Sequence, residues 1–436
     1  MTITMNMVTI TLFVVLLVAL FLNVPVGFAL GLSSVVGVLM LHAAGGSQSL
    51  AYVAQSMVTG CDSFPILAVP LFILAGELMG GGGISTRVLD ICNVFFGRFY
   101  GGLAMCAVAF CMFFAAVSGS GPATVAAVGA LVVPTMLKEG YDKKFTLATI
   151  ACAGGIGVII PPSIPMVFYG TSTGTSVGSL FMAGFLPGIL VGVCLMIYCN
   201  FIGRKNGWKT EGGKFSWKAA GKALWDGKFA ILDPIIILGG IYAGIFTPTE
   251  AAAVACVYAF ICGVFIHREM DMKVFIKTLK SAVSTTGTTM LIVGAATAFA
   301  KILSITGAPS AIANAISTVS DNGVVIMLLI LVLLLFVGCF MDTTPAMLIL
   351  APILMPIATA YGYDPVHFGI IMVVALAIGF ITPPLGINLF VAARVGDEPL
   401  ETVVSGIIPF IIIMICCLLL ITFIPAISMT LPNLMG

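Results

Sequence analysis

Two short polar segments interrupt long apolar stretches of this chain, and they carry the residue types best suited to chemistry. The first, 118–124, reads Ser-Gly-Ser-Gly-Pro-Ala-Thr, and the second, 341–345, reads Met-Asp-Thr-Thr-Pro. Glycine lets the backbone turn and expose carbonyl groups, and Ser and Thr add hydroxyls. Hard cations are bound by several such oxygen ligands. Asp342 adds an ionisable group inside an apolar segment, which marks a functional candidate. Both segments therefore predict sites for Na⁺.

A Pro-Pro pair inside an apolar run accompanies each polar segment. Gly157-Val-Ile-Ile-Pro-Pro returns 222 residues later as Gly379-Phe-Ile-Thr-Pro-Pro. Proline removes a backbone donor and blocks the regular helix, so each break frees carbonyl groups. In lipid, broken helices are tolerated only where they are buried in protein or line a cavity. A duplicated pair of breaks therefore predicts the central binding site of a transporter.

The candidate ion- and substrate-binding residues come from these four places. In the first half of the chain they are Ser118, Gly119, Ser120, Gly121, Pro122, Thr124, Gly157, Pro161, Pro162 and Ser163. In the second half they are Asp342, Thr343, Thr344, Pro345, Gly379, Thr382, Pro383, Pro384, Gly386 and Asn388. Na⁺ is expected at Ser118, Ser120, Gly157, Asp342, Thr343 and Thr382.

Structural roles compete with ion binding at these positions. Gly, Ser and Thr also favour close packing between membrane helices. Asp342 could bind Na⁺, carry a proton, or cap the helix that follows it. Glu250, which follows Thr247-Pro248-Thr249, is expected to cap a helix. Lys301 is expected to reach the outer membrane interface, with contact to an anionic substrate as the alternative.

The composition predicts an all-α polytopic membrane protein. The chain is 60% hydrophobic and 8% charged, with a mean hydropathy of +1.21, whereas soluble chains carry roughly 25% charged residues. Its apolar runs are long and continuous, unlike the alternating strands of outer-membrane barrels. The 12 Cys show no paired spacing and the three His are dispersed, so no organic cofactor is expected. The sequence shows no catalytic triad, nucleotide fingerprint or nucleic-acid motif, so neither an enzyme nor a nucleic-acid partner is predicted.

Apolar windows of about 20 residues divide the chain into two similar halves. The first repeat, 1–201, has predicted spans at 5–22, 26–42, 64–80 and 180–200, a hairpin at 103–137 and a broken helix at 145–172. The second repeat, 229–436, has spans at 229–246, 250–266, 284–303 and 405–430, a hairpin at 325–358 and a broken helix at 366–392. Amphipathic linkers are expected at 84–100 and, between the repeats, at 202–228. A further linker is expected at 304–323.

Loop charge predicts the orientation of these segments. The segments 103–137 and 325–358 could each be one long span or a re-entrant hairpin that enters and leaves the membrane on one side. Loop charge favours the hairpin, because a full crossing would place Lys143 and Lys144, or Arg394, on the side opposite 202–228. One face then holds the loops 84–102, 138–144, 202–228, 267–280 and 393–403, with 17 of the 18 Lys and Arg residues. The positive-inside rule makes that face cytoplasmic and both termini periplasmic. Loops 43–62, 304–323 and 359–366, on the opposite face, carry no Lys or Arg. Each repeat then has about five spans plus one re-entrant hairpin. Because five is odd, the two repeats are inverted.

Four motifs resemble a known family. They are SGSGPATVAAVGALVVP (118–134), GGIGVIIPPSIPMVFYG (154–170), MDTTPAMLILAPILMP (341–356) and GFITPPLGINLFVA (379–392). They resemble the large membrane (M, or DctM-type) subunit of tripartite ATP-independent periplasmic (TRAP) transporters, which belong to a wider ion-transporter superfamily. The resemblance covers essentially the whole chain. It implies Na⁺-driven secondary transport of an organic acid, such as sialic acid or a C4-dicarboxylate, across a bacterial inner membrane.

The resemblance also implies partners and a mechanism. The expected partners are a small four-helix membrane subunit and a periplasmic substrate-binding protein, both separate chains. In the implied elevator mechanism, the hairpins and broken helices move against a scaffold formed by the remaining spans and the small subunit. The linkers 84–100 and 304–323 would be the connecting arms, and substrate would bind between the hairpin tips. A stand-alone carboxylate symporter or antiporter of the same superfamily, or a non-transporting membrane anchor subunit, are the alternatives.

Overall fold

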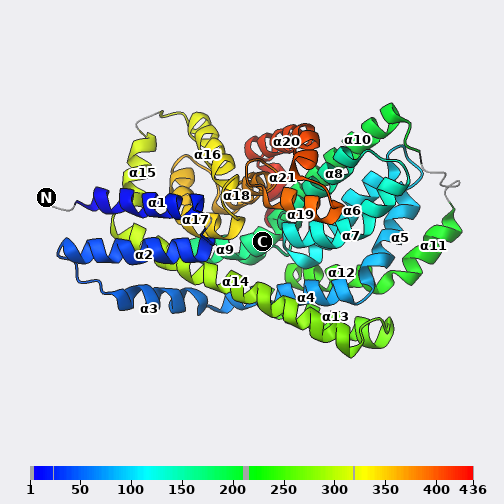
Figure 1. The fold of residues 1–436 in the computed structure, drawn as a ribbon, viewed down its shortest axis with the longest axis horizontal. Helices are drawn as coiled ribbons and strands as arrows, with labels where there is room; N and C mark the ends of the chain where they lie inside the picture. Colours follow the sequence, from blue (N-terminus) through cyan, green and yellow to red (C-terminus); the bar gives the residue numbers. More distant parts are fainter. Residues whose placement is uncertain (1–3, 23, 210–215, 318–319, 436) are drawn as a thin grey trace.

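The computed structural model describes residues 4–22, 24–209, 216–317 and 320–435, and Figure 1 shows their arrangement. Among these residues the only strand-like pairing is an isolated bridge between Tyr100 and Lys209. Eight of the described helices are long and apolar enough to cross a membrane. The predicted all-α polytopic membrane fold is therefore confirmed.

The helices of the first half begin near the N-terminus and end at Asn206. They are α1 (Met5–Phe21), α2 (Val26–Ala43), α3 (Leu50–Cys61), the 3₁₀ turn η1 (Phe64–Leu67), α4 (Ala68–Gly81), α5 (Ile84–Phe96), α6 (Gly102–Ser118), α7 (Gly121–Lys138), α8 (Lys143–Gly155), the 3₁₀ turn η2 (Ile156–Val158), α9 (Ile164–Thr173) and α10 (Val177–Asn206).

The helices of the second half begin at Trp217 and end at Met435. They are α11 (Trp217–Asp226), α12 (Lys228–Tyr242), α13 (Pro248–Ile261), the π-helical turn η3 (Cys262–Ile266), α14 (Met272–Ile305), α15 (Ala308–Ser317), α16 (Gly323–Gly338), α17 (Thr343–Ala360), α18 (Pro365–Gly379), α19 (Ile387–Gly396), α20 (Leu400–Phe423) and α21 (Ala426–Met435). The helices α13, α14, α17 and α18 each begin 222 residues after α2, α3, α7 and α8, respectively. This spacing is what a chain built from two repeats would show.

The helices pack in two groups joined by α5 and α15. In the first group, which we call the α14 bundle, α14 runs along α2, α3 and α4, and α1, α12 and α13 complete the packing (Figure 1). The second group, the hairpin bundle, contains α6 to α10 and α16 to α21. Helix α5 connects α4 to α6, and α15 connects α14 to α16. The predicted hairpins and broken helices therefore lie together in one group.

Two predicted loops are wrong because they contain helix. The loop predicted at 43–62 contains α3, and the loop predicted at 267–280 contains the first turns of α14, which begins at Met272. Hydropathy windows detect apolar length, and α3 has only 12 residues. The start of α14 carries Lys273, Lys277 and Lys280, which lower hydropathy but favour helix.

The predicted last span, 405–430, is also wrong as one helix. The chain breaks between α20 and α21 at Ile424 and Pro425. Proline lacks the N–H that would continue the ladder, and the residue before it is pushed towards extended backbone. Ile424 accordingly has φ −122° and ψ 80°.

The spans at 180–200 and 405–430 belong to the hairpin bundle and not, as predicted, to the scaffold. Helix α10 packs against α6, and α20 packs against α8 and α18. Phe410 of α20 lies edge-on to Tyr198 of α10, with ring centroids 4.9 Å apart. Phe410 also lies 5.9 Å from Phe145 of α8. Hydropathy identifies a span but says nothing about its packing partners, so the sequence could not make this assignment.

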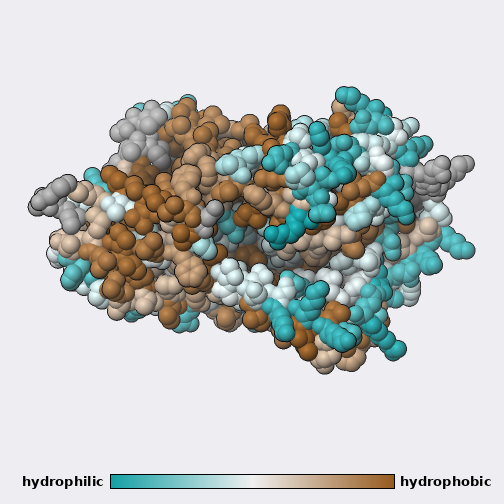
Figure 2. Space-filling view, viewed as in Figure 1, coloured by the Kyte–Doolittle hydropathy of each residue, from teal (hydrophilic) through white to brown (hydrophobic). Residues whose placement is uncertain are grey.

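The linker predicted at 202–228 is helical at both of its ends. Helix α10 continues to Asn206, and Trp208 stacks on Tyr141 of the hairpin bundle at 4.7 Å. Residues 210–215 of this linker, like residues 318–319 of the linker at 304–323, lie outside the described residues. Helix α11 then packs on α5 and exposes Trp217 and Trp225. In Figure 2 hydrophilic residues gather at this end of the molecule, whereas the opposite half is mostly apolar.

Candidate ion and substrate site

The first hairpin turns within two residues and touches the first broken helix through its backbone. Gly119 and Ser120 alone separate α6 from α7. Gly119 has φ +61°, and a Cβ at this position would lie 2.8 Å from the carbonyl oxygen of Pro162. The Ile164 N–H donates to the Gly119 carbonyl at 3.2 Å. The tip and the break therefore meet where only glycine fits.

An oxygen-rich cluster forms at this contact. The Ser118 and Thr124 hydroxyl oxygens are 3.0 Å apart, and the Thr124 hydroxyl donates to the Ser120 carbonyl at 2.8 Å. A Cβ on Gly157 would lie 2.5 Å from Thr124 Oγ1 and 2.7 Å from the Ser120 carbonyl oxygen. The structure thus brings Ser118, Ser120, Thr124 and Gly157 together. Their donor set is entirely oxygen, which fits a hard cation.

Ser163 serves the backbone of the first break. Its hydroxyl donates to the Val158 carbonyl at 2.6 Å and accepts from the Met166 N–H at 3.5 Å, so it caps α9. The peptide bond between Pro161 and Pro162 is cis, and both prolines are buried. Ser163 therefore joins the two helical segments on either side of the break.

The second hairpin presents a carboxylate at its tip. Asp342 is the N-cap residue of α17, and the Thr343 hydroxyl donates to Asp342 Oδ1 at 3.3 Å. A carboxylate at a helix N-terminus is stabilised by the helix dipole. Asp342 is half-buried, whereas Thr343 and Thr344 are buried. Asp342 forms no side-chain cap hydrogen bond with α17, so the structure does not show the capping role, and the ion-binding and proton-carrying roles stay predictions.

The second tip also touches its own break through glycine backbones. A Cβ on Gly379 would lie 2.4 Å from the carbonyl carbon of Gly338, so α16 and α18 cross in backbone contact. Beyond this crossing the Thr382 hydroxyl donates to the Ile378 carbonyl at 2.8 Å. The bond between Pro383 and Pro384 is cis, as in the first break. Gly386, with φ +28°, leads into α19.

The two breaks lie next to each other. A Cβ on Gly121 would lie 3.1 Å from the ring of Phe380. The Asn388 side-chain NH₂ donates to the Ala151 carbonyl of α8 at 3.0 Å, and its backbone N–H donates to the Phe380 carbonyl at 3.0 Å. Asn388 Oδ1 is buried and has no hydrogen-bond partner among the described residues. Asn388 therefore ties the second break to the first broken helix and leaves one oxygen available.

Pro122 and Pro345 lie within the first turns of α7 and α17. Backbone N–H groups there have no intrahelical partner, so proline costs the helix no bond. No described contact links either proline to the oxygen cluster. Pro122 and Pro345 therefore help to begin α7 and α17, the second helix of each hairpin.

Sequence reasoning missed three positions that shape the site. Gly338 and Phe380 form the contacts given above, and Gly76 of α4 brings the α14 bundle against the first tip. A Cβ on Gly76 would lie 3.1 Å from the Ser118 Cα atom. Among 49 glycines the sequence gives no reason to single out Gly76 or Gly338. Phe380 lies inside the predicted second break, but the sequence does not distinguish it from the other apolar residues there.

The donor chemistry of the site is hydroxyl, carbonyl and carboxylate oxygen. Within the part of the chain that the structure describes, no group of three or more His, Cys, Asp or Glu side chains could hold a metal ion. A cation here would therefore be held mainly by backbone and hydroxyl oxygens. Such ligands suit Na⁺ better than a transition metal.

The fold is similar to that of solved membrane transporters. The Alcanivorax borkumensis YdaH transporter matches with a TM-score of 0.59 and 15% identity, over 88% of this chain and 90% of that chain. The Neisseria gonorrhoeae efflux pump MtrF matches with a TM-score of 0.58 and 13% identity, over 88% of this chain and 85% of that chain. The chain therefore shares the polytopic helical fold of these two proteins.

The chain belongs to the DctM family, the DctM component of tripartite ATP-independent periplasmic transporters, whose family model matches residues 13–427. The isethionate TRAP transporter permease protein DctMQ of Oleidesulfovibrio alaskensis is 46% identical over 94% of this chain, which spans 64% of the length of that relative. The C4-dicarboxylate TRAP transporter large permease protein DctM of Pseudomonas aeruginosa is 40% identical, over 94% of each chain. The sialic acid TRAP transporter large permease protein SiaM of Vibrio cholerae is 37% identical, over 95% of this chain and 96% of the relative. Family membership gives the chain a role in transport.

Proposed function

We propose that this chain is the large permease subunit of a Na⁺-coupled secondary transporter that imports an organic acid across a bacterial inner membrane. The observation that carries the proposal is the oxygen cluster of Ser118, Ser120, Thr124 and Gly157 at the first break. A second tip and break, containing Asp342, lies beside it. Two adjacent oxygen sites built from unwound backbone are the arrangement used to couple ions to a substrate.

The substrate is proposed to be a small organic anion. Relatives are named for isethionate, C4-dicarboxylates and sialic acid, each of which carries an acidic group. The candidate site residues include no Arg or Lys. The acidic group would therefore be met by the N-terminal ends of α7, α9, α17 and α19, by Asn388 and by the bound cation.

Transport is proposed to follow an elevator mechanism. The two packed groups of helices support it, because the whole candidate site lies in the hairpin bundle. That bundle would slide against the α14 bundle while α5 and α15 act as arms. The first tip lies against Gly76 of α4, so this contact would have to part during the movement.

Two partners are proposed, namely a small four-helix membrane subunit and a periplasmic substrate-binding protein. The relatives are named as large permease proteins of TRAP transporters, and one carries the combined name DctMQ. In this arrangement the binding protein delivers the substrate at the periplasmic face, and the small subunit extends the scaffold.

The experiment is uptake of radiolabelled organic acids into proteoliposomes that contain this chain, the small subunit and the binding protein. We expect uptake that requires an inward Na⁺ gradient and all three components. Uptake that is unchanged when K⁺ replaces Na⁺ would contradict Na⁺ coupling. Uptake by this chain alone would favour the stand-alone symporter, and no uptake of sialic acid, C4-dicarboxylates or isethionate would contradict the proposed substrate class.

A further inference from the structure

The connection from the α14 bundle to α5 passes through three glycines. Helix α4 ends at Gly81, and Gly83, with φ +74°, precedes α5. A Cβ on Gly82 would lie 3.2 Å from the Cα atom of Gly263 in η3. The turn at the base of α5 therefore touches the backbone of η3, which continues α13 of the α14 bundle.

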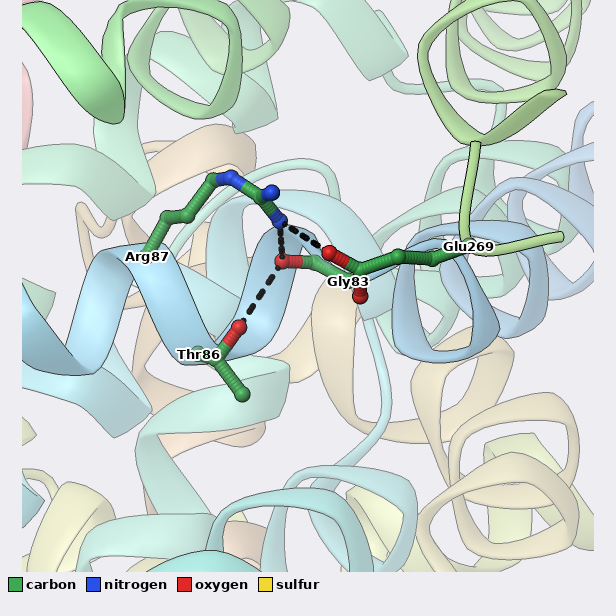
Figure 3. Close-up of polar contacts among 4 residues, drawn as sticks. All are labelled: Gly83, Thr86, Arg87 and Glu269. Carbon is green, nitrogen blue, oxygen red and sulfur yellow. Dashed lines mark hydrogen bonds and ion pairs between the residues drawn. The ribbon is translucent and has the colours of Figure 1, made fainter. Parts of the chain in front are cut away.

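An ion pair closes over this turn. Arg87 Nη1 donates to the Gly83 carbonyl at 2.6 Å and lies 2.9 Å from Glu269 Oε1, and the Thr86 hydroxyl donates to the same carbonyl at 3.0 Å (Figure 3). A Cβ on Gly83 would lie 1.9 Å from Glu269 Oε2. One guanidinium thus joins the first turn of α5, the glycine turn and the η3–α14 connection.

The ion pair lines an open pocket that other charged side chains also line. Arg87 and Glu269 line an open pocket of about 510 Å³, together with Asp90, Asp226 and Lys228 among others. Arg87, Asp90 and Asp226 also line a neighbouring pocket of about 270 Å³. Asp90 and Asp226, which line the same pockets as Arg87, are the carboxylates that could pair with it once it leaves Glu269. A cation with two alternative sets of partners can hold two discrete positions.

His267 lines the larger pocket and does not compete for Glu269 at neutral pH. Burial lowers the pKa of His267 and the charge of Arg87 lowers it further, whereas Glu269 raises it. The imidazole is therefore largely neutral at pH 7, since its usual pKa is already about 6.5. Lys228 lies over the Trp225 ring at 3.5 Å. Arg87 is the cation that the structure pairs with Glu269.

The arm in the second half of the chain lacks such a pair. Helix α15 follows Gly307, which has φ +72°, but residues 308–317 contain no Lys, Arg, Asp or Glu. At its base the Thr9 hydroxyl donates to the Thr306 hydroxyl at 2.8 Å. The two arms share a glycine turn, and only the first has a charged contact to the α14 bundle through its own helix.

We infer that Arg87 and Glu269 are positioning residues that hold α5 against the α14 bundle and so favour the position of the hairpin bundle seen here. The inference rests on the elevator mechanism proposed above. When the pair opens, α5 pivots at the Gly81–Gly83 turn and the hairpin bundle takes its other position. The pair thus sets the ratio of the two positions, while the ion and substrate site is unchanged.

The test measures the distance between the bundles directly. Val283 of α14 and Ile412 of α20, which are both exposed, are each replaced by a genetically encoded keto amino acid, and a spin label is attached to its ketone. This chemistry does not react with thiols, so the 12 Cys can stay in place. Double electron–electron resonance on the complete transporter in nanodiscs then gives the populations of the two positions. A label pair at Phe336 and Ile412, both within the hairpin bundle, should keep one distance throughout.

We expect Glu269→Gln and Arg87→Gln each to lower the ratio of the position seen here to the other position by about 1.5- to 5-fold. This is the range for partly exposed ion pairs. The exchange of both residues, R87E with E269R, should recover part of the wild-type ratio, because it restores the ion pair but not the hydrogen bond from residue 87 to the Gly83 carbonyl. Raising the salt from 0.1 to 1 M should move wild type towards the single variants and leave those variants unchanged. The matched control is Lys143→Gln, which removes the ion pair with Glu398 inside the hairpin bundle and should leave the ratio at the wild-type value.

The outcomes separate this inference from the proposed function. If two distances occur but both single variants match wild type and Lys143→Gln, the positioning role is wrong and the elevator stands. If one distance is found in every variant, with and without Na⁺ and substrate, the elevator itself is wrong and the inference falls with it. Na⁺-dependent uptake tests ion coupling separately from either result.

Discussion

The two tip-and-break pairs share a backbone plan and differ in side-chain chemistry and exposure. In each, a hairpin tip meets a Pro-Pro break at a glycine that has no room for a Cβ. The first pair contains hydroxyls and no charge, and its break is buried from residue 156 to residue 163. The second contains Asp342, and its break exposes Pro383, Pro384 and Leu385. One half of the site is therefore enclosed and neutral, whereas the other is open and charged.

This difference suggests different roles for two sites of common backbone design. A neutral oxygen cluster does not cancel the charge of a cation, so its occupancy should depend strongly on a nearby anion, such as the substrate. A carboxylate supplies that charge itself. We therefore expect the second site to contribute more to cation affinity and the first to contribute more to the dependence of Na⁺ binding on substrate.

The largest expected effect comes from removing the charge of the second tip. Asp342→Asn should reduce Na⁺-driven uptake about 30-fold or more, because losing a charge-assisted contact costs about 2 kcal/mol. Uptake in proteoliposomes measures the change. Glu401→Gln, an exposed carboxylate in the first turn of α20, is the control and should transport normally. Uptake by Asp342→Asn within twofold of wild type would mean that the two tips do not differ as proposed.

The two breaks should differ in how much an added methyl group destabilises the protein. Gly379→Ala would push α18 away from α16, because main-chain atoms of Gly338 lie 2.4 Å from the new Cβ, and overpacking costs about 1–3 kcal/mol. Gly157→Ala should cost less, because its nearest atom is the Thr124 hydroxyl, although the Ser120 carbonyl follows at 2.7 Å. Apparent melting temperatures in detergent should therefore fall further for Gly379→Ala.

The control for this pair is Gly239→Ala in α12, where a Cβ has no neighbour within 4 Å. It should not destabilise the protein, since Ala is the better helix former. Equal melting temperatures for Gly379→Ala and Gly239→Ala would show that α16 and α18 do not cross as closely as the structure has them.

The neutral tip should respond to loss of a hydroxyl in a more limited way. Thr124→Val removes the hydroxyl that joins Ser118 to the Ser120 carbonyl, and we expect the Na⁺ concentration for half-maximal uptake to rise about 2- to 10-fold. The rise should shrink at saturating substrate, if substrate charge supports this site. Thr146→Val is the matched control, because the buried Thr146 hydroxyl has no partner among the described residues. Equal Na⁺ dependence in the two variants would remove Thr124 from the ion site.

The smallest expected effect comes from a helix cap that lies outside the candidate site and is present in only one of the two repeats. Helix α13 begins with a capping box in which Thr247 and Glu250 satisfy each other's backbone N–H groups, whereas its counterpart α2 has Pro25 as its N-cap residue and no side-chain cap. Glu250→Ala should lower the apparent melting temperature by about 1–3 °C with no change in uptake. Thr247→Ser keeps the hydroxyl and should match wild type, and a loss of uptake in Glu250→Ala would show that Glu250 does more than cap.

The sequence alone determined the class of fold and the places where its helices break. Continuous apolar length requires helices in a bilayer, and proline and glycine cannot continue a helix wherever they stand. The hairpin turn at Gly119 and Ser120 and the interruptions near Pro161 and Pro383 therefore lie where the residues predict them. Apolar length and the positions of proline and glycine depend only on neighbouring residues, so they can be obtained from the sequence alone.

Only the tertiary structure decided which helices belong together and which atoms meet. No sequence pattern assigns α10 and α20 to the hairpin bundle, and α3, with 12 residues, is too short for a hydropathy window to detect. Arg87 and Glu269 are far apart in the chain and are paired only by the fold. Membrane helices present similar apolar surfaces to lipid and to each other, so hydropathy cannot choose their partners. That choice depends on shape, such as the close approach of Gly338 to Gly379, which exists only once the helices have packed.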